Sequence, residues 1–94
     1  MTKYEIYLEH RAAKQLRRLR GEIQSRIVES LRILGEHGFT ARLNIKKLRG
    51  YRNHYRLRIG EYRILFEFVR PRRIIVYAIL HRRRAYSTDV DKAT

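Results

Sequence analysis

Two alternating segments, residues 54–59 and 62–69, constrain the fold of this chain more than any other feature. In both segments apolar and polar side chains alternate, a pattern typical of strands with one buried face. A two-residue link separates the segments, and Gly60 in that link can adopt the positive φ that a tight hairpin turn requires. The sequence therefore predicts an antiparallel hairpin in which Ile59 faces Tyr62.

The predicted hairpin gathers arginines on one face. Arg58 falls opposite Arg63, with Cβ atoms about 5 Å apart, and Arg56 lies on the same face two residues earlier. At an effective dielectric constant of roughly 20, the repulsion is on the order of 3 kcal/mol before the side chains separate. That is large for a domain stabilised by about 5–15 kcal/mol. Either the side chains fan out into solvent, or they form a solvent-facing surface for a phosphate, and we favour the second interpretation.

The next turn extends this pattern. If Val69 faces Ile74, then Arg63 faces Leu80, and Arg82 lies one step further on the same face. The apolar floor beneath the arginines would consist of Leu65, Val76, Ala78 and Leu80. The opposite face, which helices should cover, carries Tyr55, Leu57, Ile59, Tyr62, Ile64, Phe66, Phe68, Ile75, Tyr77 and Ile79. Because most strand aromatics fall on the covered face, few are predicted to be available for stacking on RNA bases.

The remaining elements follow from hydrophobic periodicity. Residues 3–9 alternate and predict a first strand, while an apolar stripe at steps of three and four predicts two helices, 10–19 and 22–36. We expect Gly35 and Gly38 to end the second helix. The predicted strands that follow are 44–49, 54–59, 62–69 and 74–82. The order β-α-α-β-β-β-β, with two helices on one face of a mostly antiparallel sheet, is an α+β fold.

The length and charge of the chain point to one domain with a polyanionic partner. The chain has 94 residues and is expected to form a single domain, residues 1–94, with an ordered core over about 3–86 and a short C-terminal tail. Its net charge is +14, of which residues 42–84 contribute +12. Nucleic acid is the first candidate partner for such a basic block. The 18 arginines, against 5 lysines, favour bidentate and stacking contacts with phosphates and bases.

Composition argues against several other kinds of site. The chain has no cysteine, which excludes disulfides and cysteine-ligated metals. Four dispersed histidines without an acidic cluster argue against a metal site, so we expect neither a metal nor another cofactor. No apolar run is long enough to span a membrane, and the N-terminus lacks the apolar segment of a signal peptide. We therefore expect a cytoplasmic protein without membrane contact.

Two histidines fall at predicted pairing positions. His54 lies opposite Glu67 on the arginine-bearing face, where the two residues could act as an acid–base pair or form a cross-strand ion pair. His81 lies opposite Tyr62 on the covered face, and we expect it to be a packed, hydrogen-bonded histidine.

Three segments resemble the RelE/ParE toxin superfamily: residues 47–50 (KLRG), 55–63 (YRLRIGEYR) and 81–86 (HRRRAY). The β-α-α-β order agrees, and the resemblance spans residues 1–86. It implies a RelE-like fold and the toxin of a type II toxin–antitoxin system. In the RelE branch, it implies a ribosome-dependent endoribonuclease (mRNA interferase) that cuts messenger RNA in the ribosomal A site and so inhibits translation. The implied chemistry is attack of a ribose 2′-OH on its own phosphate, without a metal ion.

The same resemblance assigns roles to particular residues. It implies catalysis by Arg63, Arg82 and Tyr86, with Tyr86 in proton transfer. Arg83 or Arg84 could instead take the role assigned to Arg82. The residues expected to bind RNA are Lys47, Arg49, Arg56, Arg58, Arg83 and Arg84.

The resemblance also implies partners. These are a cognate RelB-like antitoxin and the ribosome with messenger RNA in its A site. An amphipathic segment bearing carboxylates would suit a cluster of arginines beside an apolar floor. Two alternatives remain, namely a non-catalytic ParE-type inhibitor of DNA gyrase and a basic RNA- or ribosome-binding protein. The arginine set and the terminal tyrosine favour RNA cleavage, because ParE-type members generally lack that set.

Overall fold

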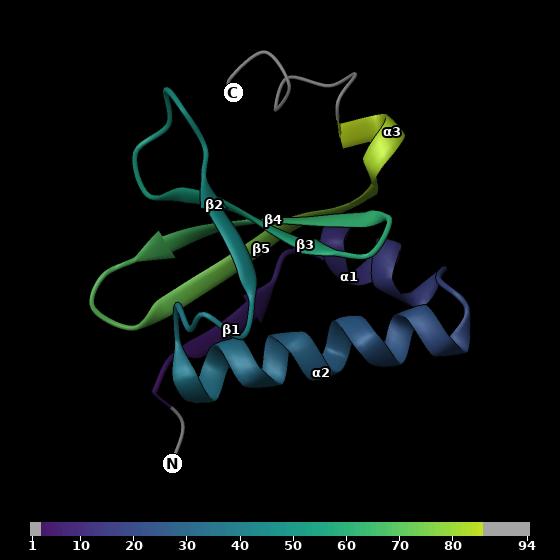
Figure 1. Cartoon of the computed structure of the whole chain (residues 1–94), viewed down its shortest axis with the longest axis horizontal. Coiled ribbons are helices and arrows are strands. Elements are labelled where there is room, and N and C mark those ends of the chain that lie inside the picture. Colours follow the sequence, from purple (N-terminus) through teal and green to yellow (C-terminus); the bar gives the residue numbers. More distant parts are fainter. Residues whose placement is uncertain (1–2, 86–94) are drawn as a thin grey trace.

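The computed structural model describes residues 3–85 of the chain, and Figure 1 shows the arrangement of its elements. In chain order these are β1 (Glu5–Leu8), α1 (His10–Arg17), α2 (Gly21–His37), β2 (Asn44–Lys47), β3 (His54–Ile59), β4 (Tyr62–Val69), β5 (Arg73–His81) and α3 (Arg82–Ala85). Every predicted strand and both predicted helices are present, with ends within two residues of the prediction. The short helix α3 was not predicted. No helix within residues 3–85 has the length and apolar character needed to cross a lipid bilayer.

The strands form one sheet with a single parallel pair among residues 3–85. Their order is β1-β5-β4-β3-β2, in which β1 runs parallel to β5 and the other neighbours are antiparallel. Helices α1 and α2 lie on one side of the sheet, whereas α3 and the loop between β2 and β3 rise on the other side (Figure 1). The predicted α+β class is therefore confirmed.

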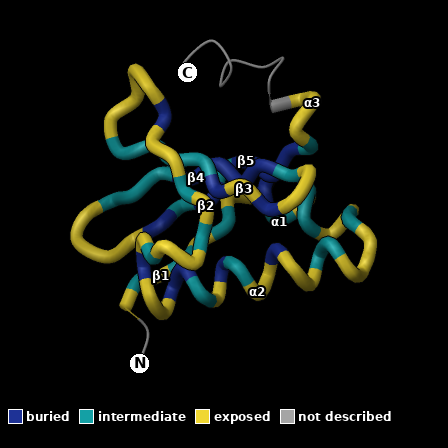
Figure 2. The backbone as a smooth tube through the Cα atoms, in the orientation of Figure 1, coloured by how far each residue is buried: buried dark blue, intermediate teal, exposed yellow. Residues whose placement is uncertain are grey.

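The main core lies between the sheet and the two long helices. On α2, Ile27, Leu31 and Leu34 are spaced at steps of three and four, and each is at most 6% exposed. They pack in one cluster with strand residues such as Leu57 and Phe66, and Figure 2 shows buried backbone along the central strands. Full burial of one such side chain contributes about 1.5–3 kcal/mol. This burial fixes which face of each strand points towards the helices.

The second long helix ends at Gly38 rather than at Gly35. Gly38 has a φ of 71°, a conformation that favours glycine. The prediction that Gly35 also ends the helix is wrong, because Gly35 lies inside α2 and is buried. A Cβ there would lie 3.3 Å from Ile6 Cγ1, and the Gly35 carbonyl accepts N–H bonds from Lys3 and Tyr4 at 3.0 and 2.8 Å. The absence of a side chain thus lets α2 approach the first strand closely.

The register of the β3–β4 hairpin is the predicted one. Ile59 faces Tyr62 and Arg58 faces Arg63, and Gly60 has a positive φ of 56°. Leu57 is fully buried on the helix side. The alternation of apolar and polar residues was therefore sufficient to place this hairpin.

The register between β4 and β5 is only partly the predicted one. Arg63 faces Leu80, as predicted. The register then shifts by one residue, because Leu65 pairs with Ala78 and Phe66 pairs with Val76, so that no residue of β4 pairs with Tyr77. The predicted pairing of Val69 with Ile74 is consequently wrong. The irregularity has the form of a β-bulge, in which one strand carries an extra residue.

Because of the bulge, each side chain in the first half of β5 points to the side of the sheet opposite to the predicted one. Ile74 and Val76 lie in the main core and are fully buried, whereas Ile75 and Tyr77 lie on the opposite side of the sheet. The predicted faces of Ile75, Val76 and Tyr77 are therefore wrong. The reason is that residues 74–80 are all apolar or aromatic. Without alternation of apolar and polar residues, the sequence does not indicate which side chains enter the core, and a register shift of one residue cannot be predicted.

The last strand also ends earlier than predicted. Arg82 begins α3, and its backbone N–H donates to the carbonyl oxygen of Glu61 at 2.6 Å. The prediction that Arg82 continues the strand face is therefore wrong. His81 faces Tyr62, as predicted, with ring centroids 5.4 Å apart. Its Nδ1 accepts the backbone N–H of Arg83 at 3.3 Å.

Candidate functional site

The side of the sheet away from α1 and α2 carries a row of basic side chains, and we call this side the open face. Its polar residues on the three strands β2 to β4 are Asn44, Lys46, His54, Arg56, Arg58, Arg63 and Glu67. Arg58 faces Arg63, and Arg56 lies one pleat away on the same face, so the predicted grouping of these three residues is confirmed. Sequence reasoning missed Lys46, which pairs with Arg56 and extends the row onto β2. Pairing 44–47 with 55–58 would have found it.

Arg63 is buried rather than solvent-facing, contrary to the prediction. Only 3% of its surface is exposed. Its Nη1 donates to the carbonyl oxygens of Gly60 and Tyr62 at 3.0 and 3.1 Å, so the guanidinium bends back towards the hairpin turn. The carbonyl dipoles stabilise the buried charge and offset its repulsion from Arg58. Arg63 is consequently a fixed cation at the base of a row in which Lys46 and Arg58 are exposed and Arg56 is partly buried.

Apolar side chains form the floor of this row. Leu65, Ala78 and Leu80 make a second buried cluster, each at most 5% exposed, and Tyr77 packs against it. Three of the four predicted floor residues, namely Val76, Ala78 and Leu80, belong to β5, and Tyr77 takes the place of Val76 because of the bulge. A dry floor lowers the local dielectric constant and strengthens the interaction of nearby cations with an anion.

The C-terminal arginines flank the open face. Nε of Arg82 lies 3.2 Å from Oε1 of Glu61, and both side chains are about half exposed. Arg83 and Arg84 are exposed on α3. Tyr86 lies outside the described residues, so its predicted place beside these arginines stays a prediction.

The residues of the KLRG segment lie at the start of the β2–β3 loop. Lys47 pairs with Tyr55, whose side chain packs on the helix side of the sheet, so Lys47 belongs to that face rather than to the open face. It is nevertheless exposed, because β2 is an edge strand. Arg49 is exposed in the loop. Both border an open hollow of about 420 Å³ formed by residues 47–52. The structure thus separates them from the row of Arg56 and Arg58.

A second group on the open face combines aromatic and acidic side chains. His54 faces Glu67, with Nε2 4.0 Å from Oε2, and His54 Nδ1 lies 3.0 Å from the hydroxyl of Tyr77. The ring of Tyr51 lies 5.6 Å from that of His54. Burial, followed by the negative charge of Glu67, raises the pKa of Tyr77 to about 12. The phenol therefore stays protonated at neutral pH.

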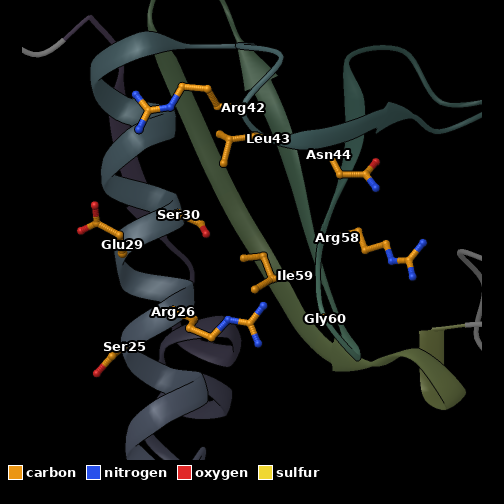
Figure 3. Close-up of a pocket in the computed structure, with 10 residues that line it drawn as sticks. All are labelled: Ser25, Arg26, Glu29, Ser30, Arg42, Leu43, Asn44, Arg58, Ile59 and Gly60. Atoms are coloured by element: carbon orange, nitrogen blue, oxygen red, sulfur yellow. The ribbon is translucent and has the colours of Figure 1, made fainter.

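A groove lies between α2 and the edge of the sheet (Figure 3). Its volume is about 480 Å³, and its lining includes Arg26, Arg42 and Arg58 together with Leu43 and Ile59. In Figure 3 the side chain of Arg26 extends from α2 towards the hairpin turn, whereas Arg58 extends away from the helix. The groove therefore joins an apolar strip to a basic rim.

Residues 3–85 contain no cluster of three or more histidine, aspartate or glutamate side chains that could hold a metal ion. The cationic side chains that the open face offers to an anion are those of Lys46, Arg56, Arg58 and Arg63. This arrangement can bind an anion and stabilise charge that develops on it.

Comparison with known proteins places the chain in a family. A family model described as the ParE toxin of type II toxin–antitoxin systems matches residues 6–86. Toxin RelE3 of Methanocaldococcus jannaschii is 49% identical over 45 residues, which make up 48% of this chain. The match spans 50% of the length of that curated relative.

Solved structures share the fold over almost the whole domain. A chain of the RelB–RelE antitoxin–toxin complex from Methanococcus jannaschii is 32% identical, with a TM-score of 0.73, covering 86% of this chain and 95% of that chain. A chain of the RelE–RelB complex from Pyrococcus horikoshii OT3 is 24% identical, with a TM-score of 0.75, covering 88% and 99%. The predicted RelE-like fold is confirmed, and the chain belongs to the RelE/ParE superfamily of toxins from type II toxin–antitoxin systems.

Proposed function

We propose that this toxin is a ribosome-dependent endoribonuclease that cleaves messenger RNA in the A site and thereby inhibits translation in the cytoplasm. The observation that carries the proposal is the row of Lys46, Arg56 and Arg58 beside the buried guanidinium of Arg63, above an apolar floor. Such a row matches a phosphodiester, because several cations lie side by side on one face and the guanidinium of Arg63 is held in place before the substrate arrives. The side chain of Arg63 needs little reorganisation when the substrate binds, because two carbonyl oxygens already hold its guanidinium.

The proposed reaction is an internal transfer at phosphorus. The ribose 2′-oxygen loses its proton and attacks the adjacent phosphorus, and the bond from phosphorus to the 5′-oxygen of the next nucleotide breaks. The products are a 2′,3′-cyclic phosphate and a 5′-OH, which takes up one proton. Arg56, Arg58 and Arg63 would stabilise the negative charge of the transition state, and Tyr86 would transfer a proton. No step requires a metal ion.

Arginines near the C-terminus would complete the substrate site. Arg82 is oriented by Glu61, and Arg83 and Arg84 are exposed beside it. Arg49 and Lys47 border the loop hollow and would contact RNA or ribosomal RNA further from the scissile bond. Because arginine contacts to phosphate carry no sequence information, these residues would set affinity rather than codon preference.

The alternative function is inhibition of DNA gyrase, and the match to the ParE family model favours it. A gyrase inhibitor that acts only by binding does not need a buried, fixed guanidinium at the base of a cationic row. The burial of Arg63 therefore supports RNA cleavage over this alternative.

We also propose a RelB-like antitoxin as partner. Similar toxins are found in RelB–RelE complexes, and this chain carries a groove with arginines at its rim and apolar residues within it. A segment that supplies carboxylates to Arg26, Arg42 and Arg58, and aliphatic side chains to Leu43 and Ile59, would match that groove. Such a complex would weaken as salt increases.

Cell-free translation with the added toxin tests the proposed activity. Primer extension should detect cuts in messages that are being translated and none in the same RNA without ribosomes. Tyr86→Phe should lower the cleavage rate if this residue transfers a proton. Uncut messages, combined with loss of supercoiling by purified gyrase, would instead establish the alternative function.

A further inference from the structure

The group of Tyr51, His54, Glu67 and Tyr77 has no role in phosphate transfer as described above. It lies on the open face, one pleat beyond Arg56 along β3. Its three rings are in contact: the centroids of Tyr51 and His54 are 5.6 Å apart, and those of His54 and Tyr77 are 5.4 Å apart. A nucleotide whose phosphate binds beside Arg56 would therefore hold its base near these rings.

The two exposed members of the group point to a ligand. Tyr51 is 46% exposed in the β2–β3 loop, so its ring gains little from burial in the free protein. Glu67 is one of two acidic residues between 42 and 84, and the other, Glu61, is engaged by Arg82. The side chain of Glu67 is 41% exposed, and among residues 3–85 its ion-pair contact is His54 at 4.0 Å. A carboxylate on a phosphate-binding surface opposes affinity for the backbone, so it suits contact with a different part of RNA.

Two internal contacts hold this group in place. The contact between His54 Nδ1 and the Tyr77 hydroxyl at 3.0 Å fixes both rings. The bulge places Tyr77 on this face, beside the buried cluster of Leu65, Ala78 and Leu80. The rings are thus supported from below, and Tyr51 and Glu67 lie at the solvent-facing side of the group.

We infer that Tyr51, His54, Glu67 and Tyr77 form a subsite for one nucleobase of a single-stranded RNA, an inference that rests on the proposed function. The base stacks on the exposed ring of Tyr51, since every base offers a π-face to an aromatic side chain. The Glu67 carboxylate accepts a hydrogen bond from an exocyclic amino group of that base. Adenine, cytosine and guanine carry such a group. Uracil presents carbonyl oxygens at the corresponding positions, which the carboxylate repels.

Binding of short RNAs to the full chain, in the absence of ribosomes, tests the subsite. Fluorescence anisotropy at low salt would compare labelled six-nucleotide RNAs of adenine, cytosine, uracil and abasic ribose. We expect the parent chain to bind the adenine and cytosine oligomers more tightly than the uracil oligomer, and the abasic oligomer most weakly. Tyr51→Leu should weaken binding of the adenine oligomer by about 5-fold to 150-fold, the range for loss of one stacked base. It should leave the abasic oligomer unchanged.

The second variant and a matched control separate stacking from charge. Glu67→Gln should remove the preference for adenine over uracil and strengthen binding of the abasic oligomer, because a negative charge is lost. Tyr51→Phe keeps the ring and should bind like the parent. Val28→Ala is the control, because Val28 is 51% exposed on α2, which lies on the other side of the sheet from this group. It should leave every affinity unchanged, and thermal melts would establish that each variant is folded.

The possible failures are distinguishable. Equal affinity of the parent for adenine and abasic oligomers, or equal weakening of both by Tyr51→Leu, would overturn the base subsite while leaving the phosphate-binding row intact. An affinity for the abasic oligomer that is insensitive to Arg58→Gln would count against the phosphate site of the proposed function itself. Retained preference for adenine in Glu67→Gln would overturn the role of the carboxylate.

Discussion

Replacement of Arg63 by methionine would separate the contribution of its charge to catalysis from its contribution to folding. Methionine keeps an unbranched apolar stem in the buried position and removes the guanidinium that donates to Gly60 and Tyr62. Nη1 carries two hydrogens, so each carbonyl oxygen accepts its own bond from a charged donor, and the two bonds together contribute about 3–6 kcal/mol. Relief of the repulsion from Arg58 and of the buried charge offsets part of this.

The expected cost to stability is therefore moderate. After about 3 kcal/mol of relieved repulsion is subtracted, a net loss of at most about 3 kcal/mol would lower the Tm by at most about 24 °C, at roughly 4–8 °C per kcal/mol for a domain of this size. A domain stabilised by about 5–15 kcal/mol would stay folded at 25 °C after that loss. The cleavage rate should nevertheless fall by about 10²-fold to 10³-fold, the effect of removing one fixed donor at developing charge.

Two measurements on the same preparations check this expectation. Circular dichroism would give the Tm, and primer extension in a cell-free translation reaction would give the cleavage rate. Arg70→Met is a matched control, because Arg70 is an exposed arginine in the turn between β4 and β5, beyond the open face. It should change neither quantity. If Arg63→Met cuts translated RNA at the parent rate, the open face is not the catalytic surface. If it is unfolded at 25 °C, the buried guanidinium is mainly structural.

Three further outcomes are expected from other parts of the molecule. Burial raises the pKa of Tyr77 to about 12 from its ordinary value of 10.0, so the folded chain keeps this proton after the unfolded chain has lost it. The free energy of unfolding, measured in urea, should therefore fall as the pH rises from about 10 to 12, and this fall should be less steep in Tyr77→Phe. Gly38→Ala should lower stability by about 1–3 kcal/mol, because φ is 71° and the new Cβ would clash with the ring of Tyr4; an unchanged Tm would refute this. Arg82→Ala should change stability by less than about 1 kcal/mol, since its ion pair with Glu61 is exposed, while it lowers the cleavage rate; equal activity would move the role to another arginine.

Local patterns in the sequence were enough to place most of the fold. In residues 54–59 and 62–69, every second residue, the one whose side chain faces the helices, is apolar or aromatic. A shift of the register by one residue would therefore bury arginines. That constraint is enough to predict the pairing of Arg58 with Arg63, which the structure confirms. The apolar stripe at helical spacing likewise predicted both long helices to within two residues.

The parts that could not be predicted depend on contacts between distant segments. In β5, neighbouring residues on both faces are apolar. The bulge at Tyr77 changes which of them enter the core, and this change leaves the local hydrophobic pattern of the sequence the same. Lys46 joins the row only through the pairing of β2 with β3. The burial of Arg63 depends on carbonyl oxygens of the turn whose direction is set by the folded backbone.

The sequence by itself determined the α+β class, the hairpin register and the side of the sheet that carries Arg56, Arg58 and Arg63, because each of these follows from the period of the side chains along one strand or helix. The tertiary structure alone decided that Arg63 is a fixed, buried cation and that Tyr77 meets His54 beside Glu67. Those features arise where strands meet in space, and the energy of a contact across the sheet depends on geometry that the order of residues along one strand does not contain.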